Sequence, residues 1–439
     1  MLSPIVHHSL QLVSFIGCLG LLLSQPQRTH LLRVLDGLLM SEKRKTISDL
    51  YRQQASRPDP KNGADFFRES RWDEVDLSQR RKRYLLQQLL QIGQQLGMLN
   101  VLKVSLDDSL GKKGKATKHL DVVDHQHNHS ESHGKRQVYS NGYVYVALHV
   151  QFGPVGFTFD MRLYLRAATV RRLNRERRKE HPELPLVPYR SKLSLAQAML
   201  TELATLLPDG YQVYVLFDSW YASAKLMNFC RRQGWHVVCA LKTNRRMNKQ
   251  RVDKHDQLLK HKHYQRITLS ATPTTPAAPT YYVRTVYGYL EAVRSSVCVI
   301  ISRRHKGDKH PKFFACTDLS LTAQAALRLY QQRWRGPSGR EVDNLYLKVF
   351  LGLGDFRLQS YEATTKWFAV VLLDLNFLQL QQAQAYAQTQ TAPPLADFIY
   401  QHRQAHFQTL IRAVAEEAIA TGDVEQVIQR FILPRDLLT

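Results

Sequence analysis

Cysteine is scarce in this chain of 439 residues. The number of cysteines is odd, their spacing is wide, and no C-x-x-C pair occurs among them: Cys18, Cys230, Cys239, Cys298 and Cys316. This pattern argues against a disulfide framework and against a zinc ribbon. It is typical of a protein that works in a reducing cytosol.

Long hydrophobic runs are also missing. The one apolar stretch, residues 9–24, is shorter than the roughly 20 residues that a membrane-spanning helix needs. No Lys or Arg precedes it, so the stretch lacks the basic flank of a signal peptide. The sequence therefore predicts a buried helix here and no membrane as a partner.

Acidic residues are few relative to basic ones. Lys and Arg total 61 against 37 Asp and Glu, which gives a net charge of +24. Such a surplus is costly for a compact protein unless a polyanion neutralises it. The excess is spread over the chain, with clusters at 80–83, 112–115, 171–179 and 242–251. This dispersed pattern favours double-stranded DNA as the partner, with an anionic membrane as the second candidate.

Residues 1–98 are predicted to be all-helical. Short helices with polar connectors are typical of helix-turn-helix DNA-binding domains. A helical bundle used for packing or dimerisation explains the same pattern equally well. The expected helices lie near residues 10–23, 28–40, 46–54, 63–68 and 79–96.

From residue 99 the pattern changes to strands and helices in the order β–β–β–α–β–α–β. This is the order of the RNase H-like fold, in which a mixed sheet gathers acids after its first strand and beside its fourth. The expected elements are strands at 99–106, 142–152 and 156–165, a helix at 194–207, a strand at 213–217, a helix at 222–233 and a strand at 236–241.

Two acidic positions follow strands in this scheme. Asp107 and Asp108 come after the first strand, and Asp218 comes after the apolar strand at 213–217. Parallel strands present their chemistry at their carboxyl ends, so these acids are candidate active-site residues. The alternative for Asp218 is a role as the N-cap of the following helix.

Five histidines lie in a polar segment between these positions. Three of them alternate and would share one face of a strand, which makes a transition-metal site conceivable. No cysteine is near, and a solvated or DNA-facing loop is favoured. The five residues are His119, His125, His127, His129 and His133.

Several segments together resemble the DDE transposases of bacterial insertion sequences. They are similar in particular to the insertion-sequence-four superfamily with its Y…R…E…K signature, and the resemblance runs from about residue 30 to 375. The segments are SLDDSLGKKGK (105–115), FDMRLYL (159–165), VLFDSWYAS (215–223), ALKTNRR (240–246), FFACTDLS (313–320), YQQRW (330–334) and LKVFLGLGDFRLQS (347–360).

This resemblance implies an α/β organisation with an RNase H-like mixed-sheet catalytic core. The core would comprise residues 99–250 and 316–380, interrupted by a β-rich insertion at 251–315. It would follow the helical N-terminal domain and precede a helical C-terminal region at 381–439, with a Gln/Ala/Thr-rich linker at 382–394. The implied activity is metal-dependent cleavage of DNA element ends and their joining to target DNA, in the bacterial cytoplasm at the nucleoid, by a homodimer. The alternatives are a non-catalytic DNA-binding descendant and an RNase H-like nuclease without strand transfer.

The implied catalytic and metal-binding acids are Asp108, Asp218 and Glu341, holding Mg²⁺ with Mn²⁺ as a substitute. Mg²⁺ prefers carboxylate oxygens, and a pair of ions can serve both the attacking and the leaving oxygen. Asp108 is chosen over Asp107 because the family's acid directly precedes a Ser or Thr, here Ser109.

The third acid departs from the family pattern. The segment between Trp334 and Glu341 is four residues longer than in relatives, and its Gly336-Pro337 pair should break a helix. Ser338 and Glu341 then read as a capping box, so Glu341 either binds metal or caps a helix. Asp343 is the runner-up acid.

The same resemblance places Tyr330, Arg333 and Lys348 on the DNA backbone near the cut end. Lys348 keeps the family's seven-residue interval from Glu341. The basic loop after the first strand adds Lys112 and Lys113 as DNA-binding candidates. Trp220 is a candidate for stacking on a displaced base, although a large apolar residue is more often part of the core.

Overall fold

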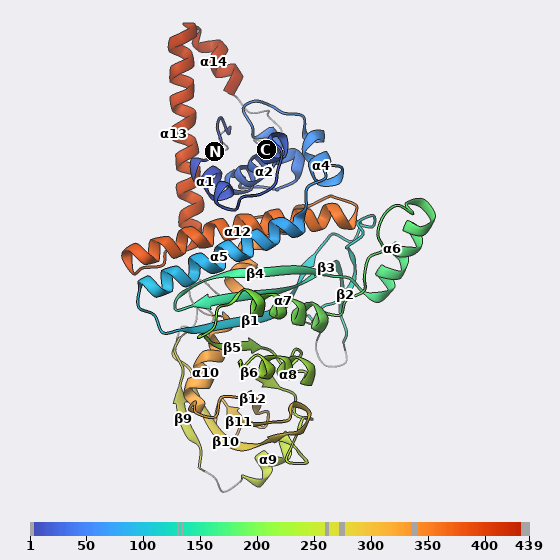
Figure 1. Cartoon of the computed structure of the whole chain (residues 1–439), viewed down its shortest axis with the longest axis vertical. Coiled ribbons are helices and arrows are strands. Elements are labelled where there is room, and N and C mark those ends of the chain that lie inside the picture. The colour runs from blue at the N-terminus through green and yellow to red at the C-terminus, as the bar shows by residue number, and fades with distance from the viewer. Residues whose placement is uncertain are drawn as a thin grey trace.

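The molecule is organised around one large mixed sheet (Figure 1). The computed structural model describes residues 4–129, 131–132, 136–259, 263–271, 277–334 and 340–431. Within these residues the strand order is β2-β3-β1-β5-β6-β12-β11-β10-β7-β8, with β4 paired to β3 and β9 paired to β10.

The catalytic half of the sheet has the RNase H-like arrangement. β1 (Val101–Lys112), β3 (Tyr139–Phe152) and β4 (Val155–Tyr164) are antiparallel neighbours. β5 (Gln212–Phe217) and β6 (His236–Leu241) then add in parallel to β1. The predicted fold class is therefore confirmed. A short extra strand, β2 (Asp124–His127), pairs with the start of β3.

β1 is longer than the predicted strand. The prediction ended it at Leu106, but Asp107 and Asp108 remain paired with Ala147 and Val146 of β3, and pairing continues to Lys112. The reason is that the long β3 offers partners beyond the acids, whereas pairing with β5 stops at Ser105. Asp107 and Asp108 are therefore still paired with β3 on one side of β1, whereas on the other side they lie just beyond the pairing with β5.

Helices cover the sheet and also make up the amino-terminal region. α5 (Glu74–Gln95) and α12 (Tyr361–Thr389) lie side by side on β4, while α7 (Lys192–Leu206) packs on β3 and β4 (Figure 1). α8 (Ala224–Arg232) packs on β6, and α10 (Ala323–Gln331) packs on β5 and β6. The predicted helices of the first 98 residues are α5 and four shorter ones: α1 (Leu10–Cys18), α2 (Gln25–Met40), α3 (Ile47–Arg52) and α4 (Pro60–Arg68).

A helix between β4 and α7 was not predicted. The basic cluster at 171–179 lies in α6 (Ala167–Glu180), whose polar composition hides its helical period. Val170 and Leu173 supply its buried contacts, which leaves the remaining face to basic side chains.

The β-rich segment after β6 extends the same sheet. β12 (Lys312–Cys316) pairs antiparallel with β6, and β11 (Ser295–Arg303) and β10 (Thr280–Leu290) continue outward. The remaining elements of this segment are β7 (Arg246–Met247), β8 (Gln250–Arg251), α9 (Val252–Leu258) and β9 (Gln265–Thr268).

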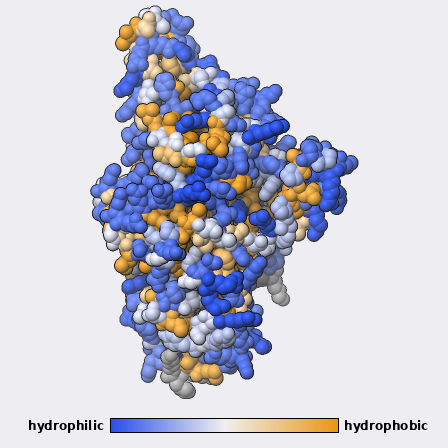
Figure 2. Space-filling model, in the orientation of Figure 1, coloured by the Kyte–Doolittle hydropathy of each residue, from blue (hydrophilic) through white to orange (hydrophobic). Residues whose placement is uncertain are grey.

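The carboxyl-terminal helices differ from the predicted linker. Residues 382–389 continue α12, so the linker prediction is wrong there; Gln382 and Ala383 are buried against neighbouring elements, which a solvated linker would not allow. α13 (Leu395–Thr421) and α14 (Val424–Phe431) follow, and α13 runs beside the amino-terminal helices (Figure 1). Apolar atoms are scattered over a mainly hydrophilic surface in Figure 2. Among the described residues, no helix is both long and apolar enough to cross a membrane.

We predict that Gly93→Ala destabilises the protein although it raises helix propensity. Ala is better than Gly in a helix by about 1 kcal/mol. A Cβ at Gly93, however, would lie 2.0 Å from Cε1 of the buried Phe152 ring, and overpacking of this kind costs about 1–3 kcal/mol. Chemical denaturation should show a net loss of stability, while Gln91→Ala on the exposed face of α5 should show none. Equal stability of the two variants would contradict the packing described here.

Candidate active site

The two predicted acidic positions lie next to each other in the sheet. The last parallel pair between β1 and β5 is Ser105 with Leu216. Continuing this register by two residues aligns Asp107 with Asp218. The carboxylates thus gather where β5 ends, at the edge where parallel strands present their chemistry.

Asp107 and Asp108 point to opposite faces of β1, because side chains alternate along a strand. Asp108 accepts hydrogen bonds from Lys192 Nζ at 2.7 Å and from the Tyr221 hydroxyl at 3.0 Å. Asp107 instead forms an ion pair with Arg333, whose Nη2 lies 2.7 Å from Oδ2. Each acid therefore has its own cation.

Asp218 is held by the turn that follows β5. Its Oδ1 accepts the backbone N–H groups of Trp220 at 2.9 Å and Tyr221 at 3.2 Å. The N-cap of α8 is Ser223, whose hydroxyl accepts from the N–H of Leu226. The capping alternative for Asp218 is thus wrong, and the turn fixes its carboxylate beside β1.

The acids act on the ionisation of their neighbours. Burial raises the pKa of the Tyr221 hydroxyl well above its usual value, and Asp108, Asp107 and Asp218 raise it further. Burial disfavours the charge on Arg333, but attraction to Asp107, with Tyr330 and Asp218, outweighs it and raises the Arg333 pKa. The Tyr221 hydroxyl therefore remains a proton donor at neutral pH, and Arg333 remains a cation.

The three residues expected on the DNA backbone are engaged within the protein. Tyr330 is buried and packs edge-on against Phe314, with ring centroids 4.9 Å apart. Arg333 donates to the Tyr330 hydroxyl at 2.9 Å as well as to Asp107. Lys348 Nζ donates to Ser109 Oγ at 2.7 Å and to the Leu110 carbonyl at 2.8 Å. All three surround β1 near the acids, and their contact with DNA stays a prediction.

Glu341 lies on α11 (Arg340–Leu345), a short helix that packs on β1. Its side chain is exposed. The predicted helix break and the Ser338 cap fall on residues outside the described part of the chain. Lys348 follows in a π-helical turn, η3 (Tyr346–Phe350). Asp108, Asp218 and Glu341 do not form a group close enough to share one metal ion within the described residues.

The runner-up acid, Asp343, is committed to the core. Its carboxylate accepts from His149 Nδ1 at 2.6 Å, from Gln379 Nε2 at 2.8 Å and from the hydroxyl of Thr158. It is fully buried between β3, β4 and α12. This network fastens α11 to the sheet, and with it the helix that carries Glu341.

The remaining predicted DNA-binding residues differ in exposure and in their contacts. Lys112 is exposed and pairs with Glu131. Lys113 donates to the Phe356 carbonyl, and burial lowers its pKa to about 8. Trp220 is 39% exposed, and Lys192 Nζ lies 5.3 Å from the centroid of its ring.

Sequence reasoning missed two partners of Asp108, Lys192 and Tyr221, which both donate to its carboxylate. Neither belongs to a spacing that signals chemistry, because one begins a helix and the other lies in a turn. Of the five predicted histidines, His129 is close enough to feel the charges of Asp108 and Asp218. His129 Nε2 lies 3.3 Å from His127 Nδ1.

A pocket of about 600 Å³ adjoins the acids, between the β-rich segment, β6 and α10. Its wall combines the turn after Asp218 with aromatic and basic residues of the inserted segment. The residues that line it include Ser219, Tyr281, Arg304, Lys312, Phe314 and Tyr330.

We predict that Arg333→Gln destabilises the fold by about 3 kcal/mol or more. Removing one partner of a buried ion pair leaves the other charge without compensation. The Arg333 side chain is 4% exposed and the Asp107 side chain 22%. Arg328→Gln on the exposed side of α10 is the matched control and should leave the thermal midpoint unchanged. A Gln variant as stable as the parent would mean that the pair does not hold this corner together.

Comparison with known proteins bears on these acids. The chain matches the family model described as DDE superfamily endonuclease over residues 15–284, a span that includes Asp107, Asp108 and Asp218 but not Glu341. No curated protein matches the chain significantly. Among solved structures, a piggyBac transposase synaptic complex with hairpin DNA is similar at 12% identity and a TM-score of 0.45, covering 88% of this chain and 73% of that chain. That similarity is too low to bear on function. Because the family model spans more than half of the sequence and both strand-end acidic positions, this chain belongs to the DDE superfamily endonucleases.

Proposed function

We propose that this protein is a DNA transposase of the insertion-sequence-four type, which binds the ends of a DNA element, cleaves them and joins them to target DNA. The observation that carries the proposal is the meeting of Asp107, Asp108 and Asp218 at one edge of an RNase H-like sheet in a chain of the DDE endonuclease family. The bacterial source and the nucleoid location remain part of this proposal.

The donor set at this edge suits a hard divalent cation. Carboxylate oxygens are the ligands that Mg²⁺ and Mn²⁺ take. When bound, a pair of such ions activates the attacking water or 3′-hydroxyl and stabilises the leaving oxygen. In the proposed site the acids hold the ions, and the turn after β5 keeps Asp218 in place through two backbone N–H groups.

Two cations neutralise the acids in the structure. Lys192 pairs with Asp108, and Arg333 pairs with Asp107. We propose that both exchange carboxylate for backbone phosphate when DNA enters, because a guanidinium or an ammonium binds phosphate oxygens as well. Arg333 suits this task best, since its planar fork can donate two parallel bonds.

The first acid can be either member of the Asp107–Asp108 pair. The family motif indicates Asp108. The register supports Asp107, which shares its face of the sheet with Asp218 and with the Arg333–Tyr330 pair. Asp108 faces the side of Lys192 and Tyr221. We therefore expect Asp107 to contribute more to cleavage than Asp108.

Glu341 is the proposed third acid. Its helix is fastened to β1 through Lys348 and to β3 through Asn344, whose Oδ1 accepts from the Tyr145 hydroxyl at 2.7 Å. Tyr330, Arg333, Glu341 and Lys348 supply the four signature types in chain order. The exposed Glu341 would supply the third carboxylate of the site.

DNA is the proposed partner on electrostatic grounds. The net charge of +24 needs a polyanion; Arg304 and Lys312 line the adjoining pocket, and Lys112 and Lys113 lie at the end of β1 and just after it. Trp220 is exposed enough to stack on an unpaired base. A homodimer on paired DNA ends is part of the proposal. Large apolar residues exposed on α13 offer a contact face for it: Tyr400, Phe407, Ile411 and Ile419.

We predict that cleavage depends on these acids. The substrate is a plasmid carrying the DNA that flanks the coding sequence of the protein, incubated with Mg²⁺ and analysed on a gel. Asp218→Asn, Asp107→Asn and Glu341→Gln should each lower the rate at least about 100-fold, and Asp108→Asn should lower it less. Asp209→Asn, an exposed acid far from the sheet edge, is the control and should cut normally.

The pattern of losses decides between the assignments. Full activity of Glu341→Gln would remove it from the site, with Asp343→Asn as the comparison at the runner-up position. A larger loss in Asp108→Asn than in Asp107→Asn would favour the motif-based choice. Cleavage without any joined product would indicate a nuclease, and DNA binding without cleavage in the parent would indicate a non-catalytic DNA-binding protein.

We predict steep salt dependence of DNA binding. Each neutralised phosphate contributes about −0.9 to the slope of log K against log salt on duplex DNA. With at least six contacts, the slope should be about −5 or steeper in a fluorescence-anisotropy titration. Lys112→Gln combined with Lys312→Gln should reduce its magnitude by about 2, one unit for each lost contact, while Asp218→Asn should not. A flat response would exclude DNA as the main partner.

A further inference from the structure

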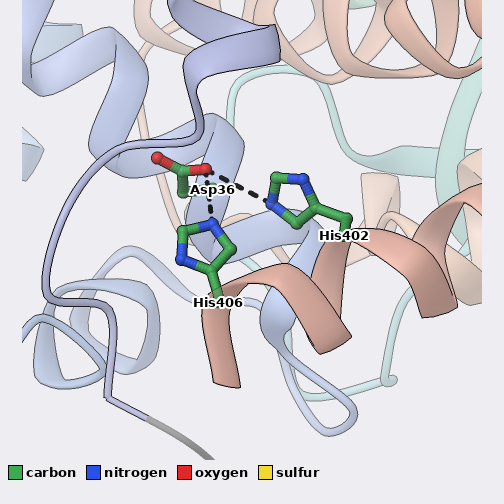
Figure 3. Close-up of side chains that lie close together, drawn as sticks. All are labelled: Asp36, His402 and His406. Carbon is green, nitrogen blue, oxygen red and sulfur yellow. Dashed lines mark hydrogen bonds and ion pairs between the residues drawn. The ribbon is translucent and has the colours of Figure 1, made fainter. Parts of the chain in front are cut away.

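A second group of chemistry-bearing side chains lies far from the sheet edge. Asp36 comes from α2, and His402 and His406 come from successive turns of α13 (Figure 3). All three residues are buried, with 0%, 5% and 4% of their surface exposed. The group lies where α13 packs against α2, so it joins two helices more than 360 residues apart in the chain.

The three side chains converge on one carboxylate oxygen. His406 Nε2 lies 3.0 Å from Asp36 Oδ1, and His402 Nε2 lies 3.3 Å from the same atom. Figure 3 shows both imidazole rings directed at the carboxylate. The histidines are four residues apart, which puts them on one face of a helix and lets them bind one ion together.

These separations match the dimensions of a metal site. Ligand atoms about 2.0–2.1 Å from a tetrahedral zinc ion stand about 3.3 Å from one another. Among the described residues, this is the only group of three His, Cys, Asp or Glu side chains whose ligand atoms are close enough to share an ion. A carboxylate that accepts hydrogen bonds from two protonated imidazoles is the competing explanation.

Unmatched polar atoms favour the ion. His402 Nε2 is buried and lies 3.3 Å from Asp36 Oδ1, but not in the geometry of a hydrogen bond. Both carboxylate oxygens of Asp374, on α12, are likewise buried without a partner there. Asp374 is close enough to Asp36 to feel its charge. The nearby Lys45 Nζ donates to the backbone carbonyls of Leu38 and Ser41. Lys45 is close enough to attract the Asp374 carboxylate, but the Asp374 oxygens have no hydrogen-bond partner among the described residues and stay available to a further ligand.

Two further groups orient the Asp36 carboxylate. His8 Nδ1 lies 2.8 Å from Oδ2, and the backbone nitrogen of Ser9 lies 3.4 Å from Oδ1. Partners of this kind commonly orient the ligands of metal sites. Oδ1 therefore remains turned toward both imidazoles.

We infer that Asp36, His402 and His406 form a transition-metal site that clamps α13 onto the amino-terminal helices, with Zn²⁺ the best-matched ion. Imidazole suits Zn²⁺, Cu²⁺ and Ni²⁺, whereas Mg²⁺ keeps oxygen ligands and water. The site therefore differs in ion type from the proposed catalytic centre. Its role is structural, because it ties one end of the chain to the other.

The test uses Co²⁺ as a spectroscopic probe on the full-length, chelator-treated protein. Asp218→Asn serves as the background, so that the proposed catalytic acids contribute less. We expect one equivalent of Co²⁺ to produce the visible absorption of a low-coordinate nitrogen–oxygen site and one equivalent of Zn²⁺ to bleach it. His402→Gln with His406→Gln should abolish the absorption. His127→Gln with His129→Gln, the exposed histidine pair, is the matched control and should keep it.

Thermal unfolding supplies a second readout. Zn²⁺ should raise the midpoint of the chelator-treated parent and of the His127/His129 variant, but not that of the His402/His406 variant. If the His402/His406 variant fails to fold, Asp36→Asn replaces it in the same measurements. X-ray absorption of the zinc-loaded parent should then show two imidazole nitrogens and a carboxylate oxygen. A parent without Co²⁺ absorption, or absorption that survives in the His402/His406 variant, would overturn the inference.

Discussion

The arrangement of this molecule depends on how it keeps carboxylates together. Asp107, Asp108 and Asp218 meet at one edge of the sheet, where their mutual repulsion opposes folding. One cation on each side of β1 offsets this repulsion: Lys192 from α7 pairs with Asp108, and Arg333 from the segment after α10 pairs with Asp107. The packing of α7 and of the segment after α10 therefore supports the position of the acids. The site and the packing of its neighbouring helices are thus parts of one electrostatic balance.

Sequence periodicity predicted the strands of the sheet and the position of Asp218 because each of these is a local signal. The apolar strand at 213–217 and the helix after it need no distant information. The partners of Asp108 could not be predicted, since Lys192 begins a helix and Tyr221 lies in a turn. The face of β1 on which each aspartate points depends on pairing with β3, which carried the strand past its predicted end. The helix α6 and the end of α12 at 382–389 could not be predicted, because both are polar in composition and their burial is set by tertiary packing.

The inserted β-rich segment forms one side of the pocket next to the acids. Its strands continue the catalytic sheet through the pairing of β12 with β6, so the insertion cannot rotate independently of the core without breaking that pairing. Tyr330 packs on Phe314 of β12, and its hydroxyl accepts a hydrogen bond from Arg333. The pocket that this creates is bounded by a strand of the insertion and by the turn after Asp218. A nucleic acid that reached the acids would therefore contact the insertion as well.

The acids at the sheet edge and the buried Asp36 cluster are compensated in different ways. At the sheet edge, long cationic side chains compensate the carboxylates, with Lys192 paired to Asp108 and Arg333 paired to Asp107. At the α2–α13 contact, no Lys or Arg among the described residues forms an ion pair with Asp36, and histidines surround it instead. Neutral imidazoles stabilise a buried carboxylate through N–H hydrogen bonds but carry no countercharge, and two imidazolium groups in a closed core would each have to be desolvated. A divalent ion satisfies the carboxylate and both imidazoles at once, which is the physical reason that this cluster suits a permanent clamp.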